Sequence, residues 1–198
     1  MRKGVSTPLI VLLILVVLTL ALQDRYAEGV KYDFRKINWG MSKGQVKATE
    51  GKEPDSETNT TVAYKVEISG DDYICGYTFL EDKLYNSGYV FIGGHTNENL
   101  YIDDYGRLKG ILTKKYGRPE TDEITWIDDL FKDDRSVWGF AISIGDLSYR
   151  STWETPTTYI TLRLWGDNYE IDLVLAYDSR RLKGWADKII SEKDESIF

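Results

Sequence analysis

Apolar and polar residues alternate along six segments of the chain, which predicts six β-strands in two groups of three. Alternation of this kind is typical of strands that bury one face. The first group comprises residues 61–69, 73–80 and 83–92. The second comprises residues 137–144, 158–165 and 169–177. Short connections, such as Glu81-Asp82 in the first group, leave no room for a crossover helix, so we expect antiparallel meanders.

A helix is expected before each group of strands. Ser42 followed by Gln45 matches a capping box. In this motif the Ser hydroxyl accepts a hydrogen bond from the Gln backbone amide, and the Gln side chain accepts one from the Ser backbone amide. This first helix should end near Glu50, because Gly51 adopts the left-handed conformation at low cost. The second helix is expected over residues 97–116, because large side chains recur along one face. These side chains are Tyr101, Tyr105, Leu108, Leu112 and Tyr116.

The order of helix, Gly stop, Pro and strands occurs twice and divides the chain. A first α+β unit is expected over residues 37–94, a second over 95–178, and a closing helix or tail over 179–198. An ordinary α+β domain without duplication is the alternative. Gly106 and Gly110 each weaken the second helix by about 1 kcal/mol relative to Ala, and we interpret them as points of close packing against the sheet.

The amino terminus has the layout of an export signal. Arg2 and Lys3 precede an uncharged apolar run over residues 8–22, the order found in secretory signals. As a helix this run spans about 22 Å, less than the ~30 Å hydrocarbon core, although residues 5–22 nearly suffice. A cleaved signal peptide and an uncleaved membrane anchor both remain open for residues 1–22. Residues 23–36 are polar and are expected to form a tether, and either alternative places the body outside the cytoplasm.

Composition and charge narrow the classes of function. With 42% hydrophobic residues, the chain can form a packed core. The net charge is −7, and without the first 22 residues 23 basic residues stand against 32 acidic ones, a net charge of −9. Such an acidic body argues against nucleic-acid binding. One Cys and one His exclude an internal disulfide framework and a Cys/His zinc site.

Few residues offer catalytic chemistry. His95 stands before the second helix without an identifiable partner, and we interpret it as a loop or capping residue. Acidic pairs begin at Asp103, Asp128 and Asp133, and the loop over residues 128–134 is expected to be solvated, because it lacks the spacing of a calcium loop. Cys75 is expected to be buried, with pairing between chains as the alternative. We expect no metal, no cofactor and no enzyme activity, with a carboxylate-dependent hydrolase as an alternative.

Residues 39–46, WGMSKGQV, with Gly51 and Pro54 after them, resemble the helix-opening motif of SmpA/OmlA (BamE-like) domains. The tandem arrangement is similar to the architecture of the beta-lactamase inhibitor protein. The resemblance implies an α+β fold in which two tandem helix-plus-three-stranded antiparallel meander units form one continuous sheet with helices on one face. It also implies a non-catalytic extracytoplasmic binding domain.

The chain departs from these families in three respects. No lipoprotein Cys follows the apolar run, and there are no Cys pairs of the inhibitor type. Two residues separate Gly51 from Pro54 where the families have one, although Gly117-Arg118-Pro119 in the second unit does match. The resemblance therefore carries over an architecture and no particular partner.

Aromatic residues give the best clue to a binding surface, since the chain has 6 Trp, 14 Tyr and 6 Phe. In the last two strands, alternation assigns one row of each to the core: Ile160, Leu162, Leu164, Ile171, Leu173 and Leu175. Tyr159, Arg163 and Trp165 then occupy the opposite face. In the third strand one side would carry Lys83, Tyr85, Tyr89 and Phe91.

Tyr, Trp and Arg are enriched at the energetic centres of protein interfaces. We therefore predict a partner-binding face formed by Tyr85, Tyr89, Tyr159, Arg163 and Trp165. A second core layer is the alternative. The sequence as a whole indicates an extracytoplasmic, non-catalytic binding module, secreted or tethered, whose protein partner lies in the envelope or outside the cell. Residues 5–22 would contact the membrane if they are not cleaved, and a structural component of an envelope complex is a further alternative.

Overall fold

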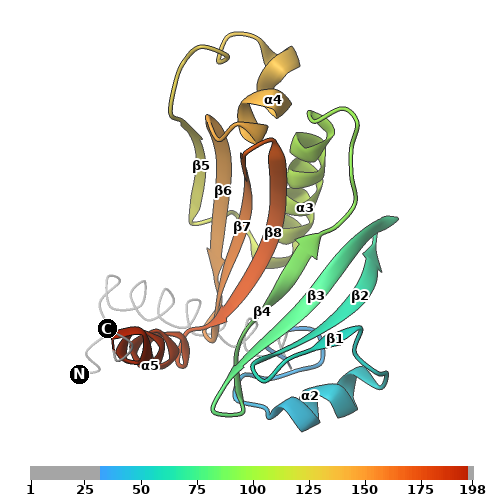
Figure 1. Cartoon of the computed structure of the whole chain (residues 1–198), viewed down its shortest axis with the longest axis vertical. Helices are drawn as coiled ribbons and strands as arrows, with labels where there is room; N and C mark the ends of the chain where they lie inside the picture. Colours follow the sequence, from blue (N-terminus) through green and yellow to red (C-terminus); the bar gives the residue numbers. More distant parts are fainter. Residues whose placement is uncertain (1–31, 196–198) are drawn as a thin grey trace, which may run out of the picture.

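The computed structural model describes residues 32–195, which fold into one eight-stranded antiparallel sheet with helices packed against it (Figure 1). The predicted α+β class is confirmed. The strands lie in the order β1-β2-β3-β4-β8-β7-β6-β5. The predicted signal or anchor over residues 1–22 lies outside the described residues, and so does the predicted tether as far as residue 31.

From residue 32 onward, the first half of the chain contains one helix and four strands. Helix α2 spans Lys43–Glu50 and is followed by the two-residue strand β1, Ser56–Glu57. Three long strands come next: β2 (Thr61–Ile68), β3 (Asp71–Leu80) and β4 (Lys83–Phe91). The three long strands agree with the predicted ones to within two residues at each end.

Local sequence signals explain the ends of these elements. The Gln45 amide donates to Ser42 Oγ over 3.2 Å, and the Ser42 amide donates to Gln45 Oε1 over 2.9 Å, so the predicted capping box is confirmed. Gly51 ends α2 in the left-handed conformation, at φ 69°. Glu81 and Asp82 both have positive φ and form the tight turn between β3 and β4.

The second half contains four strands and three α-helices. Helix α3 spans Leu100–Tyr116. The elements after it are β5 (Thr121–Trp126), a 3-10 turn (Arg135–Val137), α4 (Trp138–Ser143), β6 (Leu147–Glu154), β7 (Thr158–Asp167), β8 (Glu170–Ser179) and α5 (Lys183–Glu195). The predicted apolar face of α3 is confirmed, because Tyr105, Leu108 and Leu112 are buried in the core.

The predicted strand over residues 137–144 is wrong, because this segment forms α4. The Asp134 side chain accepts the Ser136 amide over 3.0 Å and starts a helical turn, which continues into the helix that buries Ala141 and Ile142. The third strand of the group is instead Leu147–Glu154. Residues 121–126, which lie outside the predicted strands, form the edge strand β5, so the second group has four strands instead of three.

The interpretation of Gly106 and Gly110 as close-packing positions is also wrong. Both glycines are exposed, and a Cβ added at either would find no neighbouring atom within 4 Å. They lie on the solvent side of α3, so their cost to the helix is not offset by contact with the sheet.

Helices α2, α3 and α4 and the apolar core occupy one face of the sheet, as expected, whereas α5 packs at the end of the opposite face, where Lys183 pairs with Asp178. Val46 of α2, the α3 residues and Ile142 of α4 belong to one cluster with the inward side chains of the strands. Phe34 and Ile37 belong to the same cluster at 3% and 0% exposure, so the predicted tether does not extend through Phe34. Cys75 is fully buried with a free thiol, as predicted. Across residues 32–195, no helix combines the length and apolar character needed to cross a membrane.

Strands β4 and β8 form the seam at which the two halves of the sheet meet. Residues 86–90 of β4 pair with residues 174–178 of β8 in antiparallel register. Beyond this ladder the two strands diverge, and the first residues of β8 pair only with β7 on their other side. Figure 1 shows this divergence between the upper end of β8 and the end of β4.

Candidate functional site

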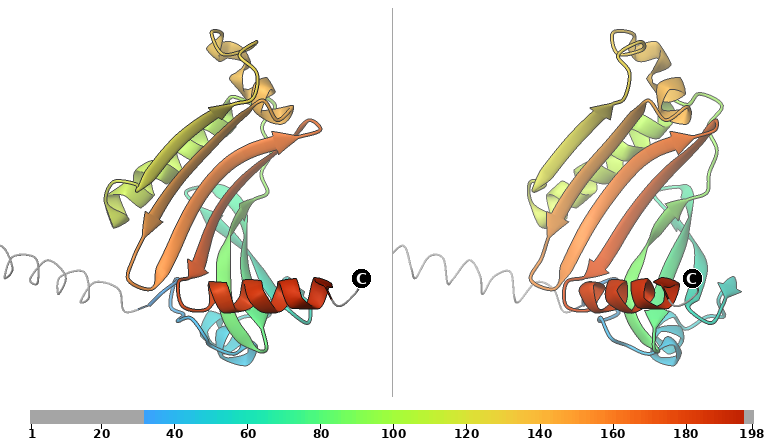
Figure 2. Two further views of the ribbon diagram at one scale, coloured as in Figure 1. Left: turned by 90° about the vertical axis from the view of Figure 1, so that its left-hand side faces the viewer. Right: turned by 60° about the vertical axis from the view of Figure 1, so that its left-hand side comes forward.

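One face of the sheet is left largely uncovered by helices. Figure 2 shows this face across β5–β8, with α3 behind the sheet and α5 across its lower end. We call it the open face and define it by the strand side chains that alternate with the buried rows. On β7, Ile160, Leu162 and Leu164 are buried, as predicted. Tyr159 and Trp165 are half-buried and Arg163 is exposed, in the intervening open-face positions.

The strand registers place one continuous row of side chains across the open face. The side chains of this row are apolar on β3, β4 and β8, and they are arginines on β7 and β6. From β2 to β5 the row consists of Lys65, Ile74, Val90, Val174, Arg163, Arg150 and Glu123. Val90 is 39% exposed, so the apolar part of this row faces solvent.

Arg163 and Arg150 are direct cross-strand partners on β7 and β6. Both are exposed, and neither forms an ion pair with any residue between 32 and 195. The Arg163 guanidinium lies 4.6 Å from the centre of the Trp165 ring. Like charges directly opposite each other destabilise a sheet. On its other side Arg150 faces Glu123 of β5, with which it forms no ion pair.

A second row on the open face consists only of small residues and threonines. From β2 to β5 it contains Ala63, Gly76, Gly88, Ala176, Thr161, Thr152 and Thr121. These short side chains keep the backbone of the sheet close to the molecular surface. A partner can therefore approach the strands here more closely than over the arginine row.

Tyr85 and Tyr89 do not share one side of β4, so this part of the prediction is wrong. The register shifts between Thr78 and Phe79, which leaves Tyr85 as an extra residue in a β-bulge. The bulge reverses the alternation, and Tyr89 therefore packs against the core, with its ring 5.3 Å from that of Phe34. Burial raises the pKa of Tyr89 to about 12.

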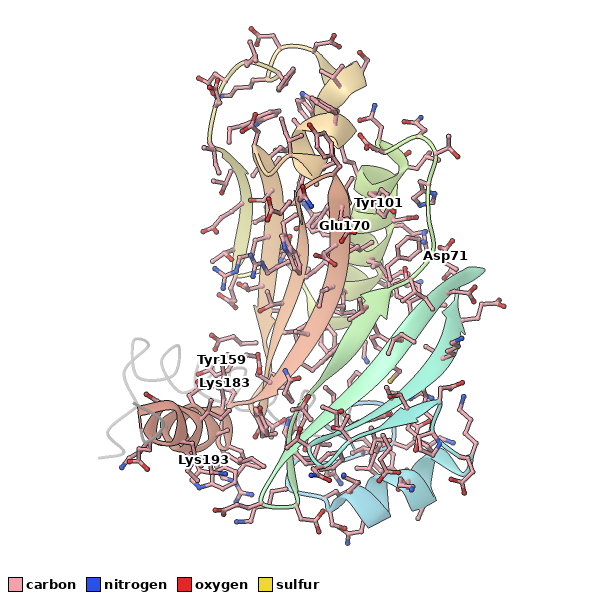
Figure 3. All side chains as sticks on the ribbon, viewed as in Figure 1. Asp71, Tyr101, Tyr159, Glu170, Lys183 and Lys193 are labelled. Carbon is pink, nitrogen blue, oxygen red and sulfur yellow. The ribbon has the colours of Figure 1, made fainter. Side chains whose placement is uncertain are left out.

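Tyr85 lies at the end of the open face where α5 begins. Lys183 Nζ is 3.2 Å from Asp178 Oδ1, and Lys83 Nζ lies 4.9 Å from the centre of the Trp185 ring, so α5 packs against the ends of β4 and β8. Figure 3 shows Lys183 close to Tyr159 at this end of the sheet. Burial beneath this helix raises the pKa of Tyr85. The structure thus brings Tyr159, Arg163 and Trp165 together, with Tyr85 at one border.

His95 belongs to a charged network that connects the two halves. Its Nε2 lies 2.6 Å from Asp104 Oδ2, and Arg107 donates to the other oxygen of Asp104 over 2.9 Å. Arg107 also binds Asp71 at the start of β3. His95 therefore has a positioned carboxylate partner that sequence reasoning missed, yet that carboxylate is itself held by Arg107. The network connects the loop before α3, α3 itself and β3.

Several hollows open on the surface of the described residues, and two of them combine aromatic rings with charged side chains. One, of about 630 Å³, is lined by Asp33, Trp39 and the two arginines Arg180 and Arg181, among others. The other, of about 340 Å³, lies between the start of α3 and the start of β8. It contains the rings of His95 and Tyr101 and the carboxylates Glu98, Glu170 and Asp172. We call this second hollow the acidic cleft.

The described residues hold no group of three or more side chains that could bind a metal ion. The acidic pairs at 128–129 and 133–134 lie in an exposed loop, where Asp129 pairs with Lys132 over 2.9 Å. Glu170 and Asp172 stand two residues apart on one strand and are both exposed. A carboxylate-dependent hydrolase therefore stays a prediction without a specific catalytic geometry to favour it.

Arg150 is the open-face residue that sequence reasoning missed. On strand β6, side chains that face the core alternate with side chains that face away from it, and this alternation could have placed Arg150 on the open face. The core-facing side chains are Leu147, Tyr149, Ser151 and Trp153. Ser151 is the polar member of this otherwise apolar core-facing row. Its hydroxyl is satisfied inside the core, because it lies 2.6 Å from Tyr105 Oη and donates to Asp122 over 2.8 Å.

No protein-family model, no curated protein and no solved structure matches this chain. The resemblance to SmpA/OmlA domains therefore stays a prediction.

Proposed function

We propose that this protein is an extracytoplasmic, non-catalytic module that binds a protein partner through its open face. The observation that carries the proposal is the exposed pair Arg150 and Arg163, held side by side, in no ion pair with any residue between 32 and 195, and flanked by Trp165. A partner that presents carboxylates to this pair would remove the repulsion between the two guanidinium groups. Binding would then be favoured, because it would relieve a repulsion that is already present in the free protein.

The surroundings of the pair suit a protein interface. Arg and Trp are over-represented among interface residues whose truncation costs most. Val90 and Val174 extend the surface as an apolar strip beside Arg163, and polar Thr161 lies next to it. An apolar centre with charged and polar residues around it is the usual anatomy of an interface.

We further infer that the sheet is assembled from two tandem units. In each unit a helix that ends at a glycine is followed by a meander, β2-β3-β4 in the first and β6-β7-β8 in the second. The last strands of the two meanders meet antiparallel at the seam, as expected for units related by an approximate two-fold axis normal to the sheet. The edge strands β1 and β5 occupy corresponding places beside β2 and β6, and α4 is an addition to the second unit. This arrangement supports the similarity to SmpA/OmlA domains and to the beta-lactamase inhibitor architecture.

The extracytoplasmic assignment is supported by the amino-terminal sequence. Arg2 and Lys3 followed by an uncharged run have the order of an export signal, and positive charge before the run favours an external body. We propose that residues 1–22 act as a signal peptide or as a membrane anchor. The partner would accordingly lie in the envelope or outside the cell.

The proposal is tested by capturing the partner with the full chain in its native cells and repeating the capture with variants. Arg163→Ala and Arg150→Ala are expected to reduce the recovery of one stoichiometric protein by about tenfold or more, as the loss of an interface hot spot does. Arg118→Ala is the matched control, because Arg118 is an exposed arginine at the end of α3. Equal recovery with all three variants would overturn the proposal.

A further inference from the structure

A second surface with unusual exposure lies at the end of the sheet that carries α4 and the β7–β8 turn (Figure 1). Ile127, Leu130 and Tyr169 are 81%, 76% and 71% exposed there. Phe140 of α4 is 39% exposed, and Phe131 is partly buried. We call these five residues the apolar tip. Such large exposure of apolar side chains is concentrated at one end of the molecule.

The apolar tip includes a continuous row of rings. The centres of the Phe131 and Phe140 rings are 5.6 Å apart, and those of Phe140 and Tyr169 are 6.4 Å apart. The row therefore connects the loop after β5, helix α4 and the β7–β8 turn. Contiguous exposed apolar surface on a soluble domain usually marks an interaction site, since its burial is favourable and its exposure is a liability.

Negative charge surrounds this surface. Asp128 and Asp133 belong to the same loop as Leu130, and Asp167 and Glu170 flank Tyr169 in the β7–β8 turn. Asp133, Asp167 and Glu170 form no ion pair within the part of the chain that the structure describes. Lys132 and Arg135 are the basic residues of the loop; Lys132 is paired with Asp129, and Arg135 lies over the Trp138 ring.

The acidic cleft adjoins the apolar tip, because Tyr169 belongs to the tip and also lines the cleft. Its volume of about 340 Å³ is bounded by the rings of Tyr101 and Tyr169 and by the carboxylates of Glu98, Glu170 and Asp172. Figure 3 shows Glu170 and Tyr101 at this position. Carboxylates combined with aromatic faces favour a cationic group, which gains from both Coulomb attraction and cation–π contact.

We propose that the apolar tip and the acidic cleft together dock a segment of another protein in which apolar side chains are flanked by Lys or Arg. The apolar side chains would cover Leu130, Phe140 and Tyr169, and a basic side chain would enter the acidic cleft. This surface is separate from the arginine pair of the open face and has the opposite charge. The inference therefore goes beyond the proposed function and does not depend on it.

Other occupants fit the charges less well. A second copy docked tip to tip would bring two sets of unpaired carboxylates together, and like-charge juxtaposition at an interface is strongly unfavourable. An anionic lipid surface attracts basic segments, whereas the charges around this tip are acidic. A basic and apolar protein segment is the occupant that satisfies both the exposed rings and the negative rim.

The test places a photo-crosslinking residue, p-benzoylphenylalanine, at Tyr169 in the full chain, expressed in its native cells. The expected result is one protein adduct whose crosslinked segment contains apolar residues with Lys or Arg beside them. The double variant Asp133→Lys/Glu170→Lys should reduce the yield of this adduct about tenfold. The matched control, Glu53→Lys/Glu67→Lys, makes the same change of charge at exposed positions of the first half and should leave the yield unchanged.

Circular dichroism and thermal unfolding of both double variants establish that each is folded before the yields are compared. A crosslink to a second copy of this chain, a crosslink to lipid, or no adduct at all would overturn the inference. An adduct whose yield is equal in the two double variants would overturn it as well, because charge would then play no part in docking. Loss of partner capture by the Arg163→Ala variant would concern the open face alone and would not bear on the apolar tip.

Discussion

Gly88 of β4 lies directly opposite Ala176 of β8, at the centre of the seam that joins the two halves of the sheet. A Cβ placed on Gly88 would stand 2.6 Å from the Leu175 carbonyl oxygen and 3.3 Å from Ala176 Cα. Both are backbone atoms of the neighbouring strand and cannot move aside independently. The close approach of β4 and β8 thus requires glycine at this position.

Gly88→Ala should lower the free energy of unfolding by about 1–3 kcal/mol or more, since overpacking at a rigid backbone contact costs about this much. Gly76→Ala is the matched control. Gly76 is the cross-strand partner of Gly88 on β3, and a Cβ there would meet no atom within 4 Å. Urea unfolding of both variants measures the difference. Equal stability of the two variants would show that the seam is not closely packed at Gly88.

Ser151→Ala should destabilise the fold by about 1–3 kcal/mol, because it removes a partner of the buried Tyr105 hydroxyl. Ser148→Ala is the control on the same strand, since Ser148 occupies an open-face position and is only half-buried. Thermal unfolding distinguishes the two. A loss of stability that is as large for Ser148→Ala would mean that the contact between Tyr105 and Ser151 contributes nothing particular.

The thiol of Cys75 should be unreactive in the folded protein. The residue is fully buried, and burial raises its pKa to about 11, so the nucleophilic thiolate is scarce near neutral pH. Ellman's reagent should therefore label one thiol per chain only after denaturant is added. Rapid labelling of the native protein, or a disulfide-linked dimer on non-reducing gels, would contradict this placement of Cys75.

Alkaline pH should unfold the protein through its buried tyrosines. Burial raises the pKa of Tyr89 and of Tyr105 to about 12, above the ordinary value of about 10. The folded state therefore holds protons that the unfolded state releases, so this contribution to stability is complete below pH ~10 and is lost as pH rises toward 12.

Ultraviolet absorbance of the phenolate tests this expectation. The buried tyrosines should ionise together with the loss of tertiary structure. Ionisation of every tyrosine in a single step near its ordinary pKa, with the fold intact, would be inconsistent with the observed burial.

Features fixed by neighbouring residues could be predicted from sequence. The capping box of Ser42 and Gln45, the stop at Gly51 and the turn at Glu81-Asp82 each depend on a few adjacent residues. The buried rows of β7 and β8 followed from alternation, because both strands bury one face against the helices. Hence Tyr159, Arg163 and Trp165 were placed on the correct side.

Features that depend on distant contacts could not be predicted. The apolar run at 137–144 fits a strand or a buried helix equally well, and the start of α4 is held by Asn99, forty residues earlier, which accepts the Gly139 amide over 2.6 Å. The bulge that separates Tyr85 from Tyr89 arises from the register with β3, which leaves no mark in the sequence of β4 itself. The acidic cleft exists only because β4 and β8 diverge, a relationship between residues about eighty positions apart in the chain.

The proposed function depends most on the pairing of Arg150 with Arg163. The most direct test is to measure the Kd between the captured partner and the Arg150→Thr variant. We expect binding to weaken by about tenfold or more, while the free energy of unfolding of the free protein stays the same or rises by about 0.2–1 kcal/mol because the repulsion across β6 and β7 is relieved. An unchanged Kd, or a loss of stability large enough to explain the weaker binding, would contradict a role for the open face in recognition.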